Sequence, residues 1–189
     1  MIHTRNTNLS ELHSSPLIAI LLPNLHGGGV ERMRIHLTHY FISRGYRVDF
    51  VLMRAEGELL QQVPDGVRVV ELKASRIRSV IVPLVRYLRL RRPDSFLAGM
   101  WPLTVVAIVA HWLSRQRGRL VVSDHVAFSM SPQASGFVKR LLLRWSVLCT
   151  YSHADACIAV SSGVAEDLSD ISSLPIERFS VVYNPAAKG

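Results

Sequence analysis

The sequence predicts a doubly wound α/β domain with a mostly parallel, Rossmann-like sheet and helices on both faces. Short aliphatic runs alternate with longer segments of helical periodicity along most of the chain. These runs are apolar at nearly every position, which is typical of strands covered on both faces. With 189 residues, 49% of them apolar, the chain has the length and hydrophobic content of one such domain.

Seven strands and five helices are expected. The strands are Leu17–Leu22, Arg47–Met53, Val67–Leu72, Ser95–Gly99, Leu120–Ser123, Cys157–Val160 and Ser180–Tyr183. The helices are Val30–Arg44, Ile77–Arg92, Pro102–Ser114, Phe137–Tyr151 and Ser161–Leu168. Gly45 should end the first helix, because glycine adopts the left-handed conformation of a helix C-terminus at little cost. Pro83 should kink or restart the second.

The inward face of the first helix is predicted from apolar residues at helical spacing: Val30, Met33, Leu37, Tyr40 and Phe41. One other apolar run, Phe96–Leu113, is as long as a membrane span and carries no charge. We interpret it as a buried strand, turn and helix, because Trp101-Pro102 divides it. The part after the proline is about 20 Å long, short of the roughly 30 Å of a bilayer core.

The chain is basic, with a net charge of +8, although only 19% of its residues are charged. This balance suits a partner that carries phosphates or anionic lipid. Nucleic acid is a weaker interpretation, because no recognition motif or aromatic stacking platform accompanies the charge. Cys149 and Cys157 are too few for a four-cysteine zinc site, and we expect both to be small buried apolar residues in a reducing, cytoplasmic setting.

A glycine loop, residues 23–32, joins the first predicted strand to the first predicted helix. Gly27, Gly28 and Gly29 would let the backbone approach a ligand, and free N–H groups at a helix start suit a phosphate or carboxylate. A P-loop is excluded because no Gly-Lys-Ser/Thr follows. A dinucleotide fingerprint is disfavoured because Arg32 occupies its third small position. A tight turn without a ligand stays open as the alternative.

An ordered set of motifs resembles the family 4 glycosyltransferases, which are retaining enzymes of the two-domain GT-B architecture. The motifs are Gly28–Arg32, Arg92-Pro93-Asp94, Val121–His125, Ala154–Ala156 with Ile158–Ser161, and Val181–Pro185. No single motif is decisive, but together they span roughly residues 17–185. The resemblance implies a polar flexible tail at 1–15, an N-terminal, acceptor-side domain at 16–185 and the start of an interdomain linker at 186–189. The C-terminal donor domain, with its Glu-x7-Glu pattern, is expected to be absent.

The resemblance also implies site residues. In this family the glycine loop contacts the diphosphate of a nucleotide-sugar, which assigns that contact to Gly28 and Gly29, with Gly27 supporting them. A histidine often occupies the position of His125, lining the cleft near the sugar and the acceptor, and His125 is the candidate catalytic residue.

Two further residues are candidates for the acceptor cleft. His26 could reach the substrate, but a solvated loop histidine is the alternative. Asp124 could bind the acceptor, but N-capping or orienting the loop is the more ordinary role of such a residue. No metal and no cofactor are expected beyond the nucleotide-sugar co-substrate.

A basic amphipathic helix carries the candidate membrane contacts Lys139, Arg140, Arg144 and Trp145. Such a helix can lie among the headgroups of an anionic membrane. Members of the family often act on lipid or lipid-linked acceptors at the cytoplasmic membrane, which agrees with this placement. The alternative is a helix that buries its apolar face on the sheet and leaves its cations in water.

The resemblance implies a hexosyltransferase domain that helps to move a sugar, with retention, from a nucleotide-sugar to a glycan or lipid-linked acceptor. Its partners would be that donor, that acceptor and its own C-terminal domain, without which it is expected to be inactive. The expected location is cytoplasmic, peripheral on the inner face of the membrane. Two alternatives stay open: half of a sugar-nucleotide epimerase, and a basic membrane-docking or interaction domain without catalysis.

Overall fold

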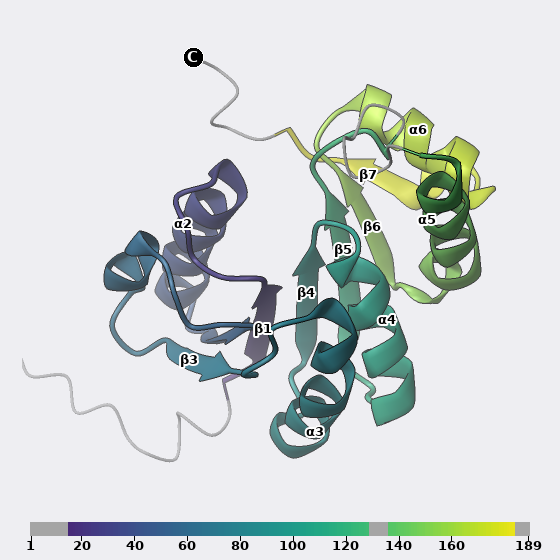
Figure 1. Ribbon diagram of the computed structural model, residues 1–189. Helices are drawn as coiled ribbons and strands as arrows, with labels where there is room; N and C mark the ends of the chain where they lie inside the picture. The colour runs from purple at the N-terminus through teal and green to yellow at the C-terminus, as the bar shows by residue number, and fades with distance from the viewer. Residues whose placement is uncertain (1–14, 129–135, 184–189) are drawn as a thin grey trace, which may run out of the picture.

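The computed structural model describes residues 15–128 and 136–183 and contains a seven-stranded sheet (Figure 1). All six neighbouring strand pairs are parallel, in the order β3-β2-β1-β4-β5-β6-β7. The strands are β1 (Leu17–Leu22), β2 (Arg47–Leu52), β3 (Arg68–Glu71), β4 (Ser95–Gly99), β5 (Arg119–Asp124), β6 (Ala156–Ala159) and β7 (Phe179–Val181). The predicted fold class and all seven predicted strands are confirmed.

Within the described residues, the strands are connected by five α-helices and four short 3₁₀ helices. The α-helices are α2 (Gly29–Ser43), α3 (Ile81–Arg91), α4 (Leu103–Ser114), α5 (Phe137–Thr150) and α6 (Ser162–Ser172). The 3₁₀ helices are η1 (Glu58–Gln62), η2 (Ile77–Val80), η5 (Tyr151–His153) and η6 (Ile176–Arg178). Helix α2 covers one face of the sheet and α3, α4 and α5 cover the other (Figure 1). The sheet is therefore doubly wound.

The core is divided between the two faces of the sheet, as alternation along β1 shows. Ile18, Ile20 and Leu22 pack in the cluster beneath α2, whereas Ala19 and Leu21 pack in the cluster beneath α3, α4, α5 and α6. Every residue of β1 is buried, because successive side chains of a strand point to opposite faces and both faces are covered.

The turn predictions agree with the structure. Gly45 has a φ of +83° just after α2. Pro83 lies in the first turn of α3, after the separate 3₁₀ helix η2, so it marks a restart of the helix. The run Phe96–Leu113 is divided between β4 and α4, as predicted. In the described parts of the chain, no helix is both long enough and apolar enough to cross a membrane.

Two predictions about burial are wrong. Cys149 is exposed on α5, so only Cys157 of the two cysteines is buried. The inward face of α2 is rotated, because Tyr40 is exposed and the most deeply buried positions are Glu31, Arg34, Ile35 and Thr38. The expected tail, apart from Ser15, and the linker at 186–189 lie outside the described residues.

Candidate functional site

The candidate site lies where the winding of the sheet reverses. Strands β1 and β4 are neighbours, but the helices that follow them, α2 and α4, lie on opposite faces. The loops after these strands therefore diverge, and such a switch point leaves a crevice beyond the carboxyl ends of the strands. The glycine loop follows β1, and His125 follows β5, the other neighbour of β4. The structure thus places both predicted features at the same edge of the sheet.

Two carboxylates lie against the glycine loop. A Cβ atom on Gly27 would collide with the carboxylate of Glu58 from η1, and one on Gly28 would collide with that of Glu31 in the first turn of α2. Gly28 is the N-cap of α2, and no side chain caps that end of the helix. Gly29 begins the helix, with open space where its side chain would be. Glycine thus allows a carboxylate to lie against the backbone at two of the three positions.

His26 lies at the surface of the same loop. Its Nε2 atom is 3.6 Å from Glu56 Oε1, and its side chain is 62% exposed. Glu56 also pairs with Arg54, at 2.9 Å. The loop beside the predicted diphosphate contact therefore carries an exposed histidine next to an ion pair.

A buried arginine stands behind His125. The Arg34 guanidinium of α2 donates to the Ser123 hydroxyl at the end of β5, and this hydroxyl lies 3.3 Å from His125 Nε2. Arg34 is only 4% exposed, and its Nε atom has no hydrogen-bond partner. Gly99 at the end of β4 leaves room for this arrangement, because a Cβ there would lie 3.4 Å from the guanidinium. Two strands, β4 and β5, and helix α2 thus meet at one polar cluster.

Burial shifts the pKa values of this cluster. It lowers the pKa of the Arg34 guanidinium to about 10, so that the side chain is still a cation at neutral pH. Burial, and then the positive charge of Arg34, lowers the pKa of His125 from 6.5 to about 4. His125 is therefore neutral at physiological pH, and its imidazole can act as a hydrogen-bond donor or acceptor, or as a base.

Asp124 is directed into the protein. Its Oδ2 accepts a 2.8 Å hydrogen bond from the Tyr151 hydroxyl, which lies 2.9 Å from the Thr104 hydroxyl. Burial raises the pKa of Asp124 from 3.8 to about 7, although the hydrogen bond from Tyr151 acts in the opposite direction. Asp124 thus anchors the end of β5 to the residue that follows α5.

All four candidate membrane contacts are exposed on α5. Only Leu143 and Val147 of this helix are buried, and Trp145 is 57% exposed among exposed apolar neighbours. The loop after β4 contacts the helix, because Trp101 Nε1 donates to Ser146 Oγ at 3.1 Å. A groove of about 400 Å³ between α5 and α6 is lined by apolar side chains together with Arg140 and Arg144.

Sequence reasoning missed Arg34, Ser123 and Tyr151 as members of the site. Arg34 could have been noticed as a charged residue one helical turn after Val30, on the predicted inner side of its helix. Tyr151 carried no such signal, because its contact with Asp124 joins residues that are 27 positions apart.

Comparison with known proteins gives one family and several related folds. The sequence model of Glycosyltransferase Family 4 matches residues 27–186. Among solved structures, the lipopolysaccharide outer core galactosyltransferase WaaB in its apo form is similar, with 17% identity and a TM-score of 0.64. Anabaena HepE in complex with UDP and glucose has 20% identity and a TM-score of 0.64. A Listeria monocytogenes protein described as a UDP-N-acetylglucosamine 2-epimerase has 9% identity and a TM-score of 0.59.

The three structural alignments cover similar fractions of this chain and of the solved chains. The alignments cover 89%, 88% and 88% of this chain but only 46%, 44% and 44% of the respective solved chains. The chain therefore spans less than half the length of the structures it resembles, and at these identities the likeness shows the fold alone. A comparison with curated protein sequences gave no match.

Proposed function

The chain belongs to glycosyltransferase family 4, and we propose that it forms the acceptor-side wall of a cleft in which a sugar passes, with retention, from a nucleotide-sugar to a glycan or lipid-linked acceptor. The observation that carries the proposal is that the glycine loop and the neutral His125 lie at the same carboxyl edge of the sheet, after strands on either side of β4. The family match supports the reaction class, and HepE, a protein of similar fold, is recorded with UDP and glucose.

In this proposal the start of α2 receives the donor diphosphate. The free N–H groups and the dipole of a helix N-terminus attract anions. The carboxylates of Glu31 and Glu58 lie against the loop and would repel a diphosphate. Both are on side chains that can rotate, so donor binding requires them to move aside. This requirement predicts that Glu58→Gln binds the donor more tightly than the wild type.

His125 has a separate role in the proposal. A neutral imidazole beside the reacting sugar can donate a hydrogen bond to a hydroxyl or accept one without adding charge to the cleft. Arg34 and Ser123 fix its ring from behind. The role therefore depends on hydrogen bonding in the transition state, which affects kcat more than KM.

The test is turnover by the natural polypeptide that contains this chain, with a panel of nucleotide-sugars and the anomeric configuration of the product determined by NMR. Retained configuration is expected, and His125→Ala should lower kcat about 100-fold, the lower end for a positioned proton donor or acceptor. His36→Ala is the matched control, because His36 is an exposed histidine of α2. Conversion of the donor sugar to its epimer without an acceptor would instead establish the epimerase alternative.

The isolated chain is proposed to be inactive. The alignments reach less than half of each solved chain, and the matched half supplies the glycine loop and His125. A nucleotide-sugar needs a second wall to hold its base and sugar, which in this family is the C-terminal domain. Measurable turnover of the donor panel by these 189 residues alone would refute this part of the proposal.

The proposal also specifies where the acceptor is held: at a membrane surface to which α5 binds. Helix α5 exposes Phe137, Val138, Leu142 and Trp145 beside the cations Lys139, Arg140 and Arg144. Apolar side chains with flanking cations suit the headgroup region of an anionic bilayer. Helix α5 is the next α-helix in the chain after His125, so we expect docking there to bring a lipid-linked acceptor toward the cleft at the inner face of the membrane.

Vesicle sedimentation tests this surface. Changing Lys139, Arg140 and Arg144 to Glu should abolish binding to vesicles that contain phosphatidylglycerol. Changing Arg68, Arg76 and Arg78 to Glu is the control, because it alters the net charge equally at exposed positions outside α5. Equal sedimentation of the α5 variant and the wild type would reject α5 as the contact.

A further inference from the structure

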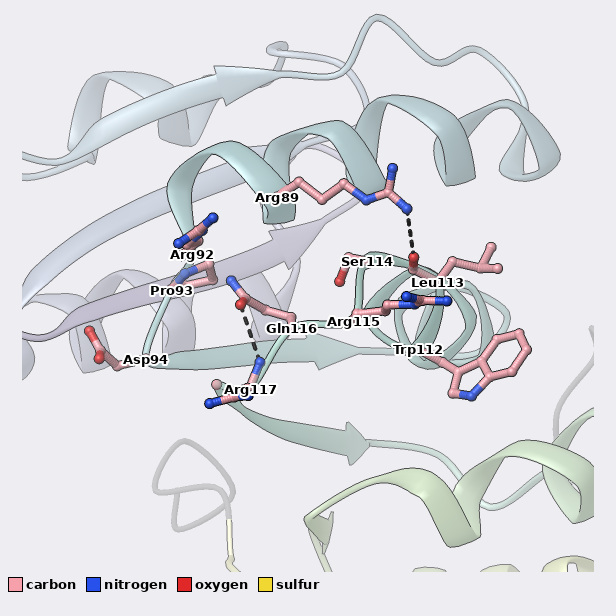
Figure 2. Close-up of a pocket in the computed structure, with 11 residues that line it drawn as sticks. Arg89, Arg92, Pro93, Asp94, Trp112, Leu113, Ser114, Arg115, Gln116 and Arg117 are labelled. Atoms are coloured by element: carbon pink, nitrogen blue, oxygen red, sulfur yellow. Dashed lines mark hydrogen bonds between the residues drawn. The ribbon is translucent and has the colours of Figure 1, made fainter.

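A second hollow lies at the opposite edge of the sheet, where β4 and β5 begin (Figure 2). It measures about 1290 Å³, and its walls are the ends of α3 and α4 with the segments that lead from them into the strands. Four arginines line it: Arg89, Arg92, Arg115 and Arg117. Asp94 is the one carboxylate among the described lining residues, and its Oδ2 already accepts a 2.7 Å hydrogen bond from the Leu17 amide.

Three of these guanidinium groups have no partner among residues 15–128 and 136–183. Arg89 Nη2 donates to the Leu113 carbonyl oxygen at 2.9 Å and so serves the C-terminal end of α4 (Figure 2). Within the described residues, the side chains of Arg92, Arg115 and Arg117 make no hydrogen bond and no ion pair. In the part of the chain that the structure describes, no carboxylate forms an ion pair with these three arginines, so the hollow is positively charged.

The backbone at this hollow is unfavourable for arginine. Arg92, the C-cap of α3, has a φ of +47°, and Arg115, the C-cap of α4, has a φ of +55°. Glycine adopts this left-handed conformation freely, whereas any other residue costs about 1 kcal/mol. Both positions direct an arginine to the same hollow (Figure 2). Glycine is common at such a C-cap, and a cation there interacts favourably with the helix dipole, so the two helix ends together concentrate positive charge at the hollow.

The walls of the hollow are fixed by close contacts. A Cβ atom on Gly118 would collide with the Pro93 carbonyl oxygen, so the segment after α4 packs directly on the one after α3. Gln116 Nε2 donates to the Leu88 carbonyl oxygen at 3.0 Å, and His111 Nε2 lies 2.8 Å from the Gly118 carbonyl oxygen. An anion entering the hollow would therefore meet arginines on a preorganised backbone, which lowers the entropic cost of binding.

We propose that this arginine pocket binds a phosphate group of an anionic ligand, at a site separate from the cleft. Guanidinium groups form paired, charge-assisted hydrogen bonds with phosphate oxygens, and several around one hollow match a dianion. Trp112 and Leu113 are exposed at the same hollow and offer apolar contact beside the charge. A soluble phosphate compound and a lipid headgroup share this chemistry, and the experiment separates them.

The first arm uses inorganic phosphate. The chain is titrated in phosphate-free buffer at constant ionic strength while backbone amide resonances are followed by NMR. Saturable shifts at residues 115–118 are expected, distinct from any at residues 27–29 in the glycine loop. The second arm measures sedimentation with phosphatidylcholine vesicles with and without phosphatidylglycerol. Binding in the first arm that the arginine variants lose indicates a soluble ligand, and vesicle binding in the second arm alone that the arginine variants lose indicates a headgroup. Absence of both overturns the proposal.

Variants identify the arginines. Arg115→Gly with Arg117→Gln removes two guanidinium groups, so we expect at least tenfold weaker binding of phosphate. The glycine also removes the backbone strain of an arginine in the left-handed conformation, so Tm should not fall. Arg92→Gly is a second variant with the same expectation. Ser173→Gly relieves a φ of +56° at the C-cap of α6, away from the pocket, and should leave binding unchanged. Wild-type affinity in both arginine variants would overturn the proposal, whatever the activity of the cleft.

Discussion

The two edges of the sheet handle charge in opposite ways. At the carboxyl edge, Arg34, Asp124 and His125 are largely buried, and burial shifts all three pKa values toward the neutral forms. At the amino edge, the cations of the arginine pocket, Arg89, Arg92, Arg115 and Arg117, are exposed. Burying an ion costs much free energy because the ion loses its water, whereas an ion that stays in water pays little of this cost. Substitutions of the ionisable side chains at the carboxyl edge should therefore change stability and protonation, and those of the arginines at the amino-edge pocket should change ligand binding.

The largest expected effect is that of Asp124→Asn. The folded pKa of Asp124, about 7, lies above its ordinary value of 3.8. Between these values the folded state binds more protons than the unfolded state, so the free energy of unfolding falls as the pH rises. Asn keeps an acceptor for Tyr151 and does not ionise. At pH 8 we expect the variant to be more stable than the wild type by up to about 4 kcal/mol.

Urea denaturation at several pH values measures this effect. The difference between Asp124→Asn and the wild type should shrink as the pH falls from 7 toward 4, because the native carboxyl is then protonated. Asp65→Asn, at an exposed position, is the control and should show no such trend. A variant less stable than the wild type at pH 8 would mean that the Asp124 carboxylate is stabilised by interactions that outweigh its burial.

A steric contrast between the edges gives the next largest effect. In Gly118→Ala the new Cβ meets the backbone carbonyl of Pro93, which cannot rotate away, and we expect a loss of about 3 kcal/mol. In Gly28→Ala the new Cβ meets the carboxylate of Glu31, which can rotate away. The loss in the free energy of unfolding should therefore be below about 1 kcal/mol. Gly163→Ala, with open space in α6, is the control. Similar losses at Gly118 and Gly28 would show that Glu31 is held as rigidly as the backbone.

The sequence predicts the sheet well because local signals mark its elements. Gly45 and Pro83 act through backbone conformation alone. Gly45 lies just after the end of α2, and Pro83 lies in the first turn of α3. The apolar runs identify β1 and β4 because both faces of these strands are covered. Cys149 was misplaced because α5 leaves most of its surface exposed, and a single sequence does not say how much of a helix a neighbour covers.

The polar cluster could not be predicted in the same way. Hydrophobic periodicity assigns apolar residues to the inside of a helix, yet α2 buries Arg34 and Thr38. The reason is that α2 meets the carboxyl ends of the strands, where Ser123 offers a hydroxyl to the guanidinium. This contact joins residues 89 positions apart. Motif resemblance predicts His125 as a site residue, but only the fold shows which groups lower its pKa.

Arg34→Met should have the smallest effect on stability and a specific one on His125. The positive charge of Arg34 is the second cause of the low pKa of His125, after burial. Removing it should raise that pKa from about 4 by about one unit, still below 6.5 because the ring stays buried. Stability should not fall, because methionine replaces a buried cation that has no carboxylate partner in the described residues.

NMR titration of the His125 ring measures this pKa, with two comparisons that separate charge from packing. Arg34→Lys keeps a cation and should keep the pKa near its wild-type value. Ser123→Ala removes the hydroxyl between the two side chains but keeps the charge, so the pKa should move less than in Arg34→Met. An unchanged pKa in Arg34→Met would mean that burial alone lowers the pKa of His125 and that the charge of Arg34 on α2 has no part in it.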